Sequence, residues 1–292
     1  MLKRNSSLIT DPKGIQFLQW CLPRLGLRWP GFRKVRRRVY KRLKRRLHEL
    51  GLPSLDAYQV FLEDHADEWT MLSSLCWMPI THFYRDRSVF QYLETDILPR
   101  LAQLVIEAKG NELRCWSTGC AGGEEPYTLA ILWKQCLALR YPTLQFRVVA
   151  TDIDGQAIQR AKRACYHWSS MKELPPKWRA QASVASGGEL CLKDEYRASA
   201  TFFVQDLRAA VPDGRFQLIL CRNLAFTYFD ETSQQETLAR LTEKLVPGGA
   251  LIIGKLEALP EGEWGIEPWS THMGVYRKPL VQAGHVVPIS QD

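Results

Sequence analysis

Residues 116–127 read WSTGCAGGEEPY, and this stretch decides the fold. It follows a short apolar run at 113–117, passes through a turn that contains Gly119, Gly122 and Gly123, and then enters a helix. A strand, a glycine-rich turn and a helix N-terminus form a general site for a nucleotide-like ligand, because glycine lets the backbone approach the ligand and take positive φ angles. The turn does not match Gly-x-Gly-x-x-Gly, which disfavours an ordinary dinucleotide enzyme.

The sequence after Gly110 alternates between short apolar runs and amphipathic helical patterns. The predicted strands and helices are 113–117, 126–139, 146–150, 156–164, 216–220 and 251–253. This order predicts an α/β fold, with a doubly wound, mostly parallel sheet covered by helices on both faces. Residues 166–205 break the alternation, and their apolar pieces at Leu190–Leu192 and Thr201–Val204 predict a small antiparallel β insertion.

The N-terminal region has a different pattern, and we predict that residues 1–78 form an all-α domain. Residues 33–46 hold ten lysines and arginines and no acid. The same segment carries an apolar stripe at spacings of three and four: Val35, Val39, Leu43, Leu47 and Leu50. The stripe predicts a helix with one buried edge and a strongly positive outer face. That face is either simply solvated or binds a partner rich in negative charge, such as nucleic acid or an acidic protein surface.

The composition of the 292-residue chain excludes several classes of protein. Apolar residues make up 46% of the sequence, which is enough for a sizeable core, and no apolar run is long enough to span a membrane. The stretch from Met1 to Asp11 lacks the continuous apolar segment of a secretion signal, so we expect a cytoplasmic protein. The eight cysteines are scattered without a Cys-x-x-Cys pair, so we expect free thiols and neither a metal site nor disulfides.

Two acidic residues beside the glycine turn indicate the ligand. Asp152 ends the strand that follows, 29 residues after Gly123, where a carboxylate can accept both hydroxyl hydrogens of a ribose. Its alternative role is to cap the next helix, for which Asp154 is better placed. Glu124 stands at the mouth of the turn, where carboxylates would repel a pyrophosphate. They suit a ligand with positive charge and no phosphate, which favours S-adenosylmethionine over NAD.

Several sequence blocks, in their order and spacing, resemble the chemoreceptor glutamate methyltransferase (CheR) family. The blocks are THFYRD at 81–86, WSTGCAGGEEPY at 116–127, ATDID at 150–154, CRN at 221–223, YFD at 228–230 and PGG at 247–249. The likeness covers residues 12–278 and identifies the chain as a divergent member. It implies a Rossmann-like class I methyltransferase fold, with S-adenosylmethionine bound by a domain at 79–292. The amphipathic helix, Pro-Gly-Gly turn and buried strand across 238–253 are also typical of doubly wound methyltransferases.

The resemblance also implies roles for single residues. The implied cofactor contacts, which include Gly119 of the glycine turn, are Thr81, Arg85, Gly119, Glu124, Asp152, Asp206, Leu207, Asn223 and Leu224. Arg85 and Tyr228 would lie near the transferred methyl group and act in catalysis. Arg85 could instead be a surface ion-pair residue, Tyr228 a core residue, and Asp206 a turn cap. No metal is implied.

Two departures from the family pattern fall on this site. Pro79 stands where the family usually has Asn, which removes one expected cofactor contact. Residues 224–227 place Tyr228 one position further from Asn223 than usual, which bears on its proposed role.

The function implied by the resemblance is an O-methyltransferase that forms methyl esters on glutamate side chains of a chemoreceptor-like protein and releases S-adenosylhomocysteine. A glutamate is ionised at neutral pH, so the reaction needs no general base. The basic helix would hold an acidic helical protein, such as a chemoreceptor cytoplasmic region, through Arg37, Arg38, Lys41 and Arg45. Alternatives are a non-receptor protein or small carboxylate as acceptor, or a module that senses the cofactor without turnover. RNA methylation is disfavoured because the chain lacks an Asn/Asp-Pro-Pro-Tyr-type motif.

Overall fold

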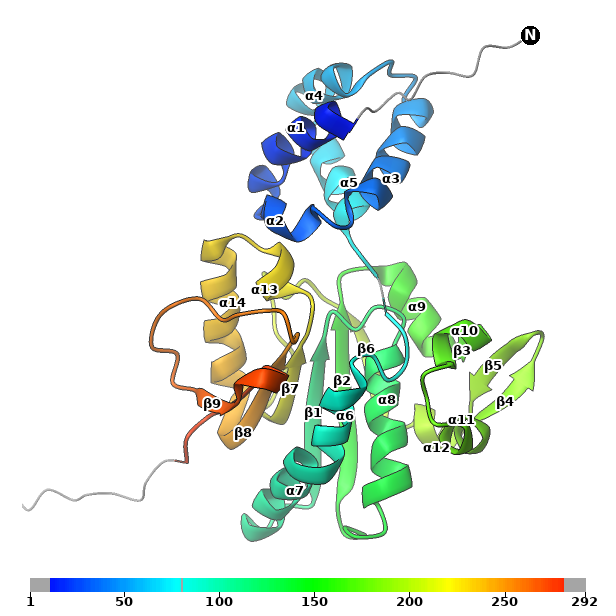
Figure 1. Cartoon of the computed structure of the whole chain (residues 1–292), viewed down its shortest axis with the longest axis vertical. Helices are drawn as coiled ribbons and strands as arrows, with labels where there is room; N and C mark the ends of the chain where they lie inside the picture. The colour runs from blue at the N-terminus through cyan, green and yellow to red at the C-terminus, as the bar shows by residue number, and fades with distance from the viewer. Residues whose placement is uncertain (1–10, 80, 281–292) are drawn as a thin grey trace, which may run out of the picture.

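The computed structural model describes residues 11–79 and 81–280, in two connected parts (Figure 1). Residues 1–10, Ile80 and residues 281–292 lie outside the described residues. The first of these segments bears on the predicted absence of a secretion signal, and the other two belong to the predicted 79–292 domain. A helical part stands above a mixed α/β part. Among the described residues, no helix is long and apolar enough to cross a membrane.

The helical part contains no strand in residues 11–76, apart from one isolated bridge, as the sequence predicts. Its elements are α1 (Asp11–Cys21), η1 (Pro23–Leu25), α2 (Trp29–Phe32), α3 (Arg36–Glu49), α4 (Leu55–Asp64) and α5 (Ala66–Cys76). The apolar stripe of α3 packs inward, with Val39, Leu43 and Leu47 fully buried. Helix α4 begins after Ser54, whose Oγ accepts a hydrogen bond from the Ala57 amide at 3.1 Å.

The α/β part is built on a seven-stranded sheet in the order β6-β2-β1-β7-β8-β10-β9. The strands are β1 (Glu112–Thr118), β2 (Gln145–Asp152), β6 (Ala200–Val204), β7 (Phe216–Cys221), β8 (Leu245–Ile253), β9 (Glu267–Ser270) and β10 (Val275–Arg277). The first five strands pair in parallel, and β10 runs antiparallel to β8 and β9. The predicted doubly wound, mostly parallel sheet is therefore confirmed.

Helices cover both faces of this sheet. The helical segments are α6 (Arg87–Tyr92), η2 (Leu93–Ile97), α7 (Leu98–Glu107), α8 (Glu124–Leu132), η3 (Trp133–Leu137), α9 (Gly155–Arg163), α13 (Ala225–Tyr228), α14 (Glu231–Lys244) and η4 (Thr271–Met273). Leu218 and Leu220 of β7 pack toward α6–α9, whereas Ile219 and Cys221 face α14 and the helical part. Because successive side chains of a strand point to opposite faces, burial on both sides explains the continuous apolar run of β7.

The strand order reverses beside β1, which has β2 on one side and β7 on the other. In open α/β sheets, ligands bind at such a switch point, outside the carboxyl ends of the strands. The helical part stands over this end of the sheet, so both parts border the same space (Figure 1).

The inserted unit is smaller than predicted. It holds β3 (Cys165–Tyr166), α10 (Trp168–Met171), α11 (Pro176–Ala182), β4 (Ser183–Ser186), β5 (Glu189–Leu192) and α12 (Asp194–Arg197), with an antiparallel sheet in the order β3-β5-β4. The prediction that Thr201–Val204 belongs to this unit is wrong, because these residues form β6 and pair in parallel with β2. The apolar residues of β6 do not indicate which strand it pairs with, and as an edge strand it leaves Phe203 and Val204 exposed.

Two further expectations are corrected by contacts between strands. Cys165 and Cys191 face each other across β3 and β5 and form a disulfide, so the expectation of free thiols is wrong for this pair. The Pro-Gly-Gly stretch at 247–249 is not a separate turn. It lies inside β8, where the register against β7 shifts and Gly248 takes a φ of +78°. A bulge accommodates the extra residues without ending the strand.

A buried ion network ties the helices of the N-terminal part together. Glu68 is 6% exposed and accepts hydrogen bonds from the Arg46 guanidinium at 2.9 and 2.6 Å and from the Tyr58 hydroxyl at 2.6 Å. The hydrogen bonds from Arg46 hold the pKa of Glu68 below its ordinary value, against the effect of burial.

We expect Glu68→Gln to lower the free energy of unfolding by about 1–3 kcal/mol at pH 7, because the variant loses charged hydrogen bonds in a buried setting. The exposed Glu63→Gln change should have almost no effect. A lowered pKa in the folded state contributes stability above the unfolded pKa and loses it as the pH falls through the folded pKa. Denaturant titrations should therefore show the difference from wild type shrinking in acid, and a pH-independent difference would contradict this account.

Candidate functional site

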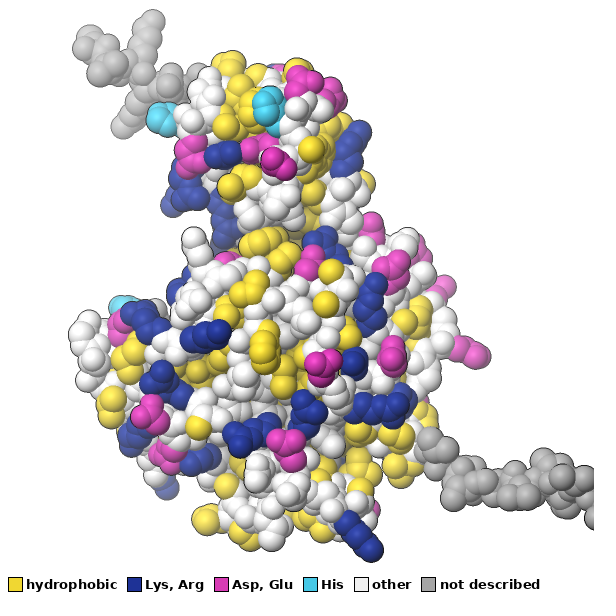
Figure 2. Space-filling model, turned by 180° about the vertical axis from the view of Figure 1, so that it is seen from behind, with side chains coloured by type: hydrophobic (Ala, Val, Ile, Leu, Met, Phe, Trp, Pro, Cys, Tyr) yellow, Lys and Arg dark blue, Asp and Glu magenta, His cyan; other side chains and the backbone are white. Residues whose placement is uncertain are grey.

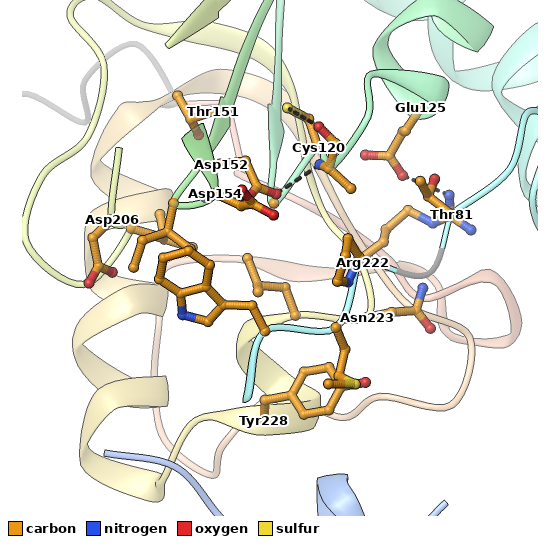
Figure 3. Close-up of a pocket in the computed structure, with 18 of the residues that line it drawn as sticks. Thr81, Cys120, Glu125, Thr151, Asp152, Asp154, Asp206, Arg222, Asn223 and Tyr228 are labelled. Carbon is orange, nitrogen blue, oxygen red and sulfur yellow. Dashed lines mark hydrogen bonds and ion pairs between the residues drawn. The ribbon is translucent and has the colours of Figure 1, made fainter. Parts of the chain in front are cut away.

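A pocket opens at the switch point of the sheet and receives residues from both parts of the chain. Nine of the residues predicted from the sequence line it: Thr81, Arg85, Gly119, Asp152, Asp206, Leu207, Asn223, Leu224 and Tyr228. Segments far apart in the sequence thus meet at one place, and Figure 3 shows Asp152, Asp206 and Tyr228 around a common space. The helical part supplies one wall, with Leu27, Phe32 and Trp77.

The glycine turn forms the floor beside β1. Gly119 has a φ of +62°, and a Cβ atom there would lie 2.6 Å from Cδ2 of Leu224. Gly123 has a φ of +90°, and a Cβ atom would lie 2.9 Å from Cβ of Ala161 on α9. Only glycine combines this backbone conformation with such close packing, so the turn brings the backbone to the edge of the pocket.

Asp152, at the end of β2, is held rigidly. Its Oδ2 accepts a hydrogen bond from the Ala121 amide and its Oδ1 accepts one from the Asp154 amide, both at 2.8 Å. Burial raises the pKa of Asp152, although these two amide hydrogen bonds favour the charged form. Asp154 caps α9 by accepting from the amides of Gln156 and Ala157, as predicted. Asp152 is therefore available to a ligand rather than needed as a helix cap.

Glu124, predicted as a cofactor contact, does not line the pocket. Its side chain is 8% exposed and turns back over Gly122, where Oε1 accepts a hydrogen bond from Ser170 at 3.3 Å. Burial raises its pKa. The next residue, Glu125, lines the pocket instead and was missed, because adjacent residues at a helix start point in different directions.

Arg222 is a second residue missed by the sequence analysis, although it lies within the Cys-Arg-Asn block. Its side chain is 2% exposed and forms ion pairs with Asp86 at 2.6 Å and Glu125 at 2.8 Å. It also donates to the Arg85 carbonyl at 3.2 Å. A buried guanidinium needs such acidic partners. The presence of Asp86 and Glu125 in other matched blocks was the sequence signal that could have identified Arg222. Arg222 thereby fixes the segment that carries Thr81 and Arg85.

Asp206 combines both roles considered for it. Its Oδ1 accepts a hydrogen bond from the Arg208 amide at 2.9 Å, which is a turn cap, and it forms an ion pair with the Arg208 guanidinium at 2.8 Å. Burial acts to raise its pKa, but the hydrogen bonds from Arg208 outweigh burial and lower it. Asp206 still lines the pocket together with Gln205, whose buried Oε1 has no hydrogen-bond partner among the described residues.

Tyr228 and Asn223 lie on the segment after β7. Asn223 has a φ of +55°, and its amide donates to Oε2 of Glu257 at 2.8 Å. Glu257 also accepts a hydrogen bond from the Thr227 hydroxyl. Burial raises the pKa of Tyr228, while the positive charge of Arg85 acts in the opposite direction. The one-residue shift in this segment therefore leaves Tyr228 in the pocket, which Arg85 also lines.

The lysines and arginines of α3, apart from Lys44, divide into two groups. Three are engaged inside the molecule: Arg36 with Asp11, Arg46 with Glu68, and Arg42 with the carbonyls of Leu75 and Trp77. The predicted substrate-binding residues Arg37, Arg38, Lys41 and Arg45 are exposed, and of these Arg45 pairs with Glu49 at 3.5 Å. Lysine and arginine side chains gather along one edge of the helical part (Figure 2).

Comparison with known proteins identifies the family to which this pocket belongs. Residues 80–273 match the family described as CheR methyltransferase, SAM binding domain. The chain belongs to the CheR methyltransferase family.

Among its relatives, the CheR chain is 32% identical to the chemotaxis protein methyltransferase of Escherichia coli over 228 residues, which covers 75% of each protein. It is 32% identical to the chemotaxis protein methyltransferase of Listeria monocytogenes over 186 residues, covering 64% of this chain and 68% of the relative. A 104.1 kDa Rhodobacter capsulatus protein is 32% identical over 224 residues, but this chain spans only 23% of its length.

The protein is thus an S-adenosylmethionine-dependent methyltransferase, and the CheR pocket fits this cofactor. Asp152 offers a fixed carboxylate at the end of β2, and the unpartnered Oε1 of Gln205 offers a buried hydrogen-bond acceptor. Acidic side chains suit a ligand that carries positive charge and no phosphate. Among the described residues, no cluster of three or more His, Cys, Asp or Glu is placed to hold a metal ion.

If Asp152 accepts hydrogen bonds from the ribose hydroxyls, as predicted from the sequence, Asp152→Asn should weaken S-adenosylhomocysteine binding about 10- to 100-fold at pH 7, because an amide replaces a charged acceptor. Calorimetry from pH 7 downward should show wild-type affinity falling before an ordinary aspartate would titrate, because burial raises the pKa of Asp152. The variant should lack this pH dependence. Equal affinity of the two proteins at pH 7 would remove Asp152 from the cofactor site.

Proposed function

We propose that this CheR methyltransferase forms methyl esters on glutamate side chains of a chemoreceptor-like protein in the cytoplasm. The observation that carries the proposal is that Arg85 and Tyr228 line the same pocket, which is bordered by the helical part, whose α3 presents exposed cations. The names of the Escherichia coli and Listeria monocytogenes relatives support a role in chemotaxis.

The site chemistry suits a carboxylate acceptor. When bound, S-adenosylmethionine supplies a methyl group on a positively charged sulfur, and a carboxylate oxygen can accept it without losing a proton. A glutamate is already ionised at neutral pH, with an ordinary pKa of about 4.3, so proximity and alignment are the main requirements. Arg85 would orient the acceptor through charge-assisted hydrogen bonds, and Tyr228 would complete the wall that faces it.

The exposed cations of α3 would bind the acceptor protein. Crowded positive charges on one helix face repel one another, and an acidic partner relieves that repulsion. Such complementary charges mainly raise the association rate and fix the orientation of the partner. An acidic helical segment laid along Arg37, Arg38, Lys41 and Arg45 would bring its glutamates toward the pocket.

The proposal predicts alkali-labile transfer of labelled methyl from S-adenosylmethionine to a purified chemoreceptor cytoplasmic fragment. At saturating cofactor, Arg85→Ala should lower the rate about 10- to 100-fold and Tyr228→Phe about 3- to 10-fold, in line with the loss of a charged and a neutral hydrogen bond. The exposed Arg87→Ala is the matched control and should stay near wild type.

Alkali-stable label would show a different acceptor chemistry. Transfer confined to another protein or to a small carboxylate would overturn the chemoreceptor assignment, and full activity in both variants would remove the two residues from catalysis.

Charge reversal tests the docking face. Arg37→Glu with Lys41→Glu should raise KM for the acceptor protein about tenfold or more and reduce the salt dependence of kcat/KM, since exposed charges act over about 10 Å at 0.1 M salt. Affinity for S-adenosylhomocysteine should not change. The control is Lys109→Glu with Arg140→Glu, which reverses two exposed cations near the amino ends of β1 and β2. Equal effects of the two pairs would indicate only a general charge effect.

A further inference from the structure

The segment that carries Tyr228 is held from outside by the helical part. Leu27 forms an antiparallel bridge with Phe229, and the Asp230 amide donates to the Gly26 carbonyl at 3.0 Å. The Arg28 amide donates to the Tyr228 carbonyl at 2.8 Å. Residues about 200 positions apart in the sequence thus pair as neighbouring backbones beside the pocket.

The Arg28 side chain adds a second layer of contacts. Its guanidinium donates to the Thr227 carbonyl at 3.2 Å and to the Phe226 carbonyl. Both carbonyls belong to α13, the single helical turn Ala225–Tyr228. The last carbonyls of any helix lack partners within the helix, and a one-turn helix cannot stabilise itself. Arg28 satisfies two of these carbonyls with a charged donor and therefore acts as a cap supplied by a distant part of the chain.

Close packing reinforces this cap. A Cβ atom on Gly31 would lie 2.3 Å from the Thr227 carbonyl oxygen, so α2 approaches α13 as closely as a glycine allows. The Phe32 ring packs edge-on against the Tyr228 ring, with 5.1 Å between centroids. On the other side of the segment, Glu257 accepts the Thr227 hydroxyl hydrogen bond. The helical part thus contacts Tyr228 directly, and the loop after β8 holds the neighbouring Thr227.

We propose that Arg28 is a positioning residue for methyl transfer, acting through α13 to hold Tyr228 in the pocket. This inference rests on the proposed role of Tyr228 at the acceptor site. Arg28 does not itself line the pocket. Its hydrogen bonds go to the backbone carbonyls of Phe226 and Thr227 through its guanidinium and of Tyr228 through its amide. Its effect should therefore fall on kcat and not on cofactor affinity.

The test compares wild type, Arg28→Ala, Arg28→Lys and the control Arg24→Ala. Arg24 is exposed and packs over the Trp20 ring, and its replacement by alanine removes the same charge from the same segment. Hydrogen exchange of a peptide covering residues 224–231 should accelerate about tenfold in Arg28→Ala, less in Arg28→Lys and not in Arg24→Ala. At saturating cofactor, kcat of Arg28→Ala should fall about 3- to 10-fold and no further than that of Tyr228→Phe, with S-adenosylhomocysteine affinity and the acceptor KM within twofold of wild type.

A double-variant cycle separates positioning from general destabilisation. In a Tyr228→Phe background, Arg28→Ala should lower kcat by less than twofold further, because both changes act on one group. Unchanged hydrogen exchange in Arg28→Ala, or an equal loss of kcat in both backgrounds, would overturn the inference. If the wild type methylates no acceptor, the proposed function fails, whereas the hydrogen-exchange comparison still decides whether Arg28 holds the segment.

Discussion

The burial of one charged side chain, Arg222, constrains the whole site. A guanidinium removed from water is stable only with acidic partners, and Arg222 finds them in Asp86 and Glu125. These partners come from the segment before α6 and from the start of α8, so one ion network joins three segments that line the pocket. Removing either acid would leave an uncompensated buried charge. The same network brings the backbone of Arg85 to the end of β7, where the acceptor chemistry is proposed to occur.

Much of the fold was accessible from sequence because it depends on local patterns. The central strand β7 is buried on both faces from Leu218 to Cys221 and has a continuous apolar run there, whereas β1 and β2 carry shorter apolar pieces toward their carboxyl ends. The prediction failed where the deciding contact is between distant residues. Strand β6 belongs to the sheet only through its pairing with β2, and Cys165 meets Cys191 only because β3 and β5 lie side by side. No local pattern encodes either pairing.

The sequence predicted which residues lie at the candidate site better than it predicted where their side chains point. The family resemblance identified nine residues that line the pocket, and six of them belong to the matched blocks: Thr81, Arg85, Gly119, Asp152, Asn223 and Tyr228. Choosing between adjacent acids required the direction of a side chain, and there Glu124 proved buried while Glu125 faces the pocket. Arg222 and Arg28 were missed because their partners are carboxylates and backbone carbonyls far away in the sequence, and such hydrogen bonds can be identified only in the folded chain.

One apolar core runs without interruption from the helical part onto the face of the sheet that carries Ile219 and Ile253. The helical part and the α/β part look separate in the fold, but they share one hydrophobic core. Exchanging the helical part for that of a relative, to redirect the enzyme to another acceptor, would also replace Leu27, Phe32 and Trp77 of the pocket wall. Under the proposed function, a change of acceptor made through the helical part would therefore also alter the wall of the pocket that binds the cofactor.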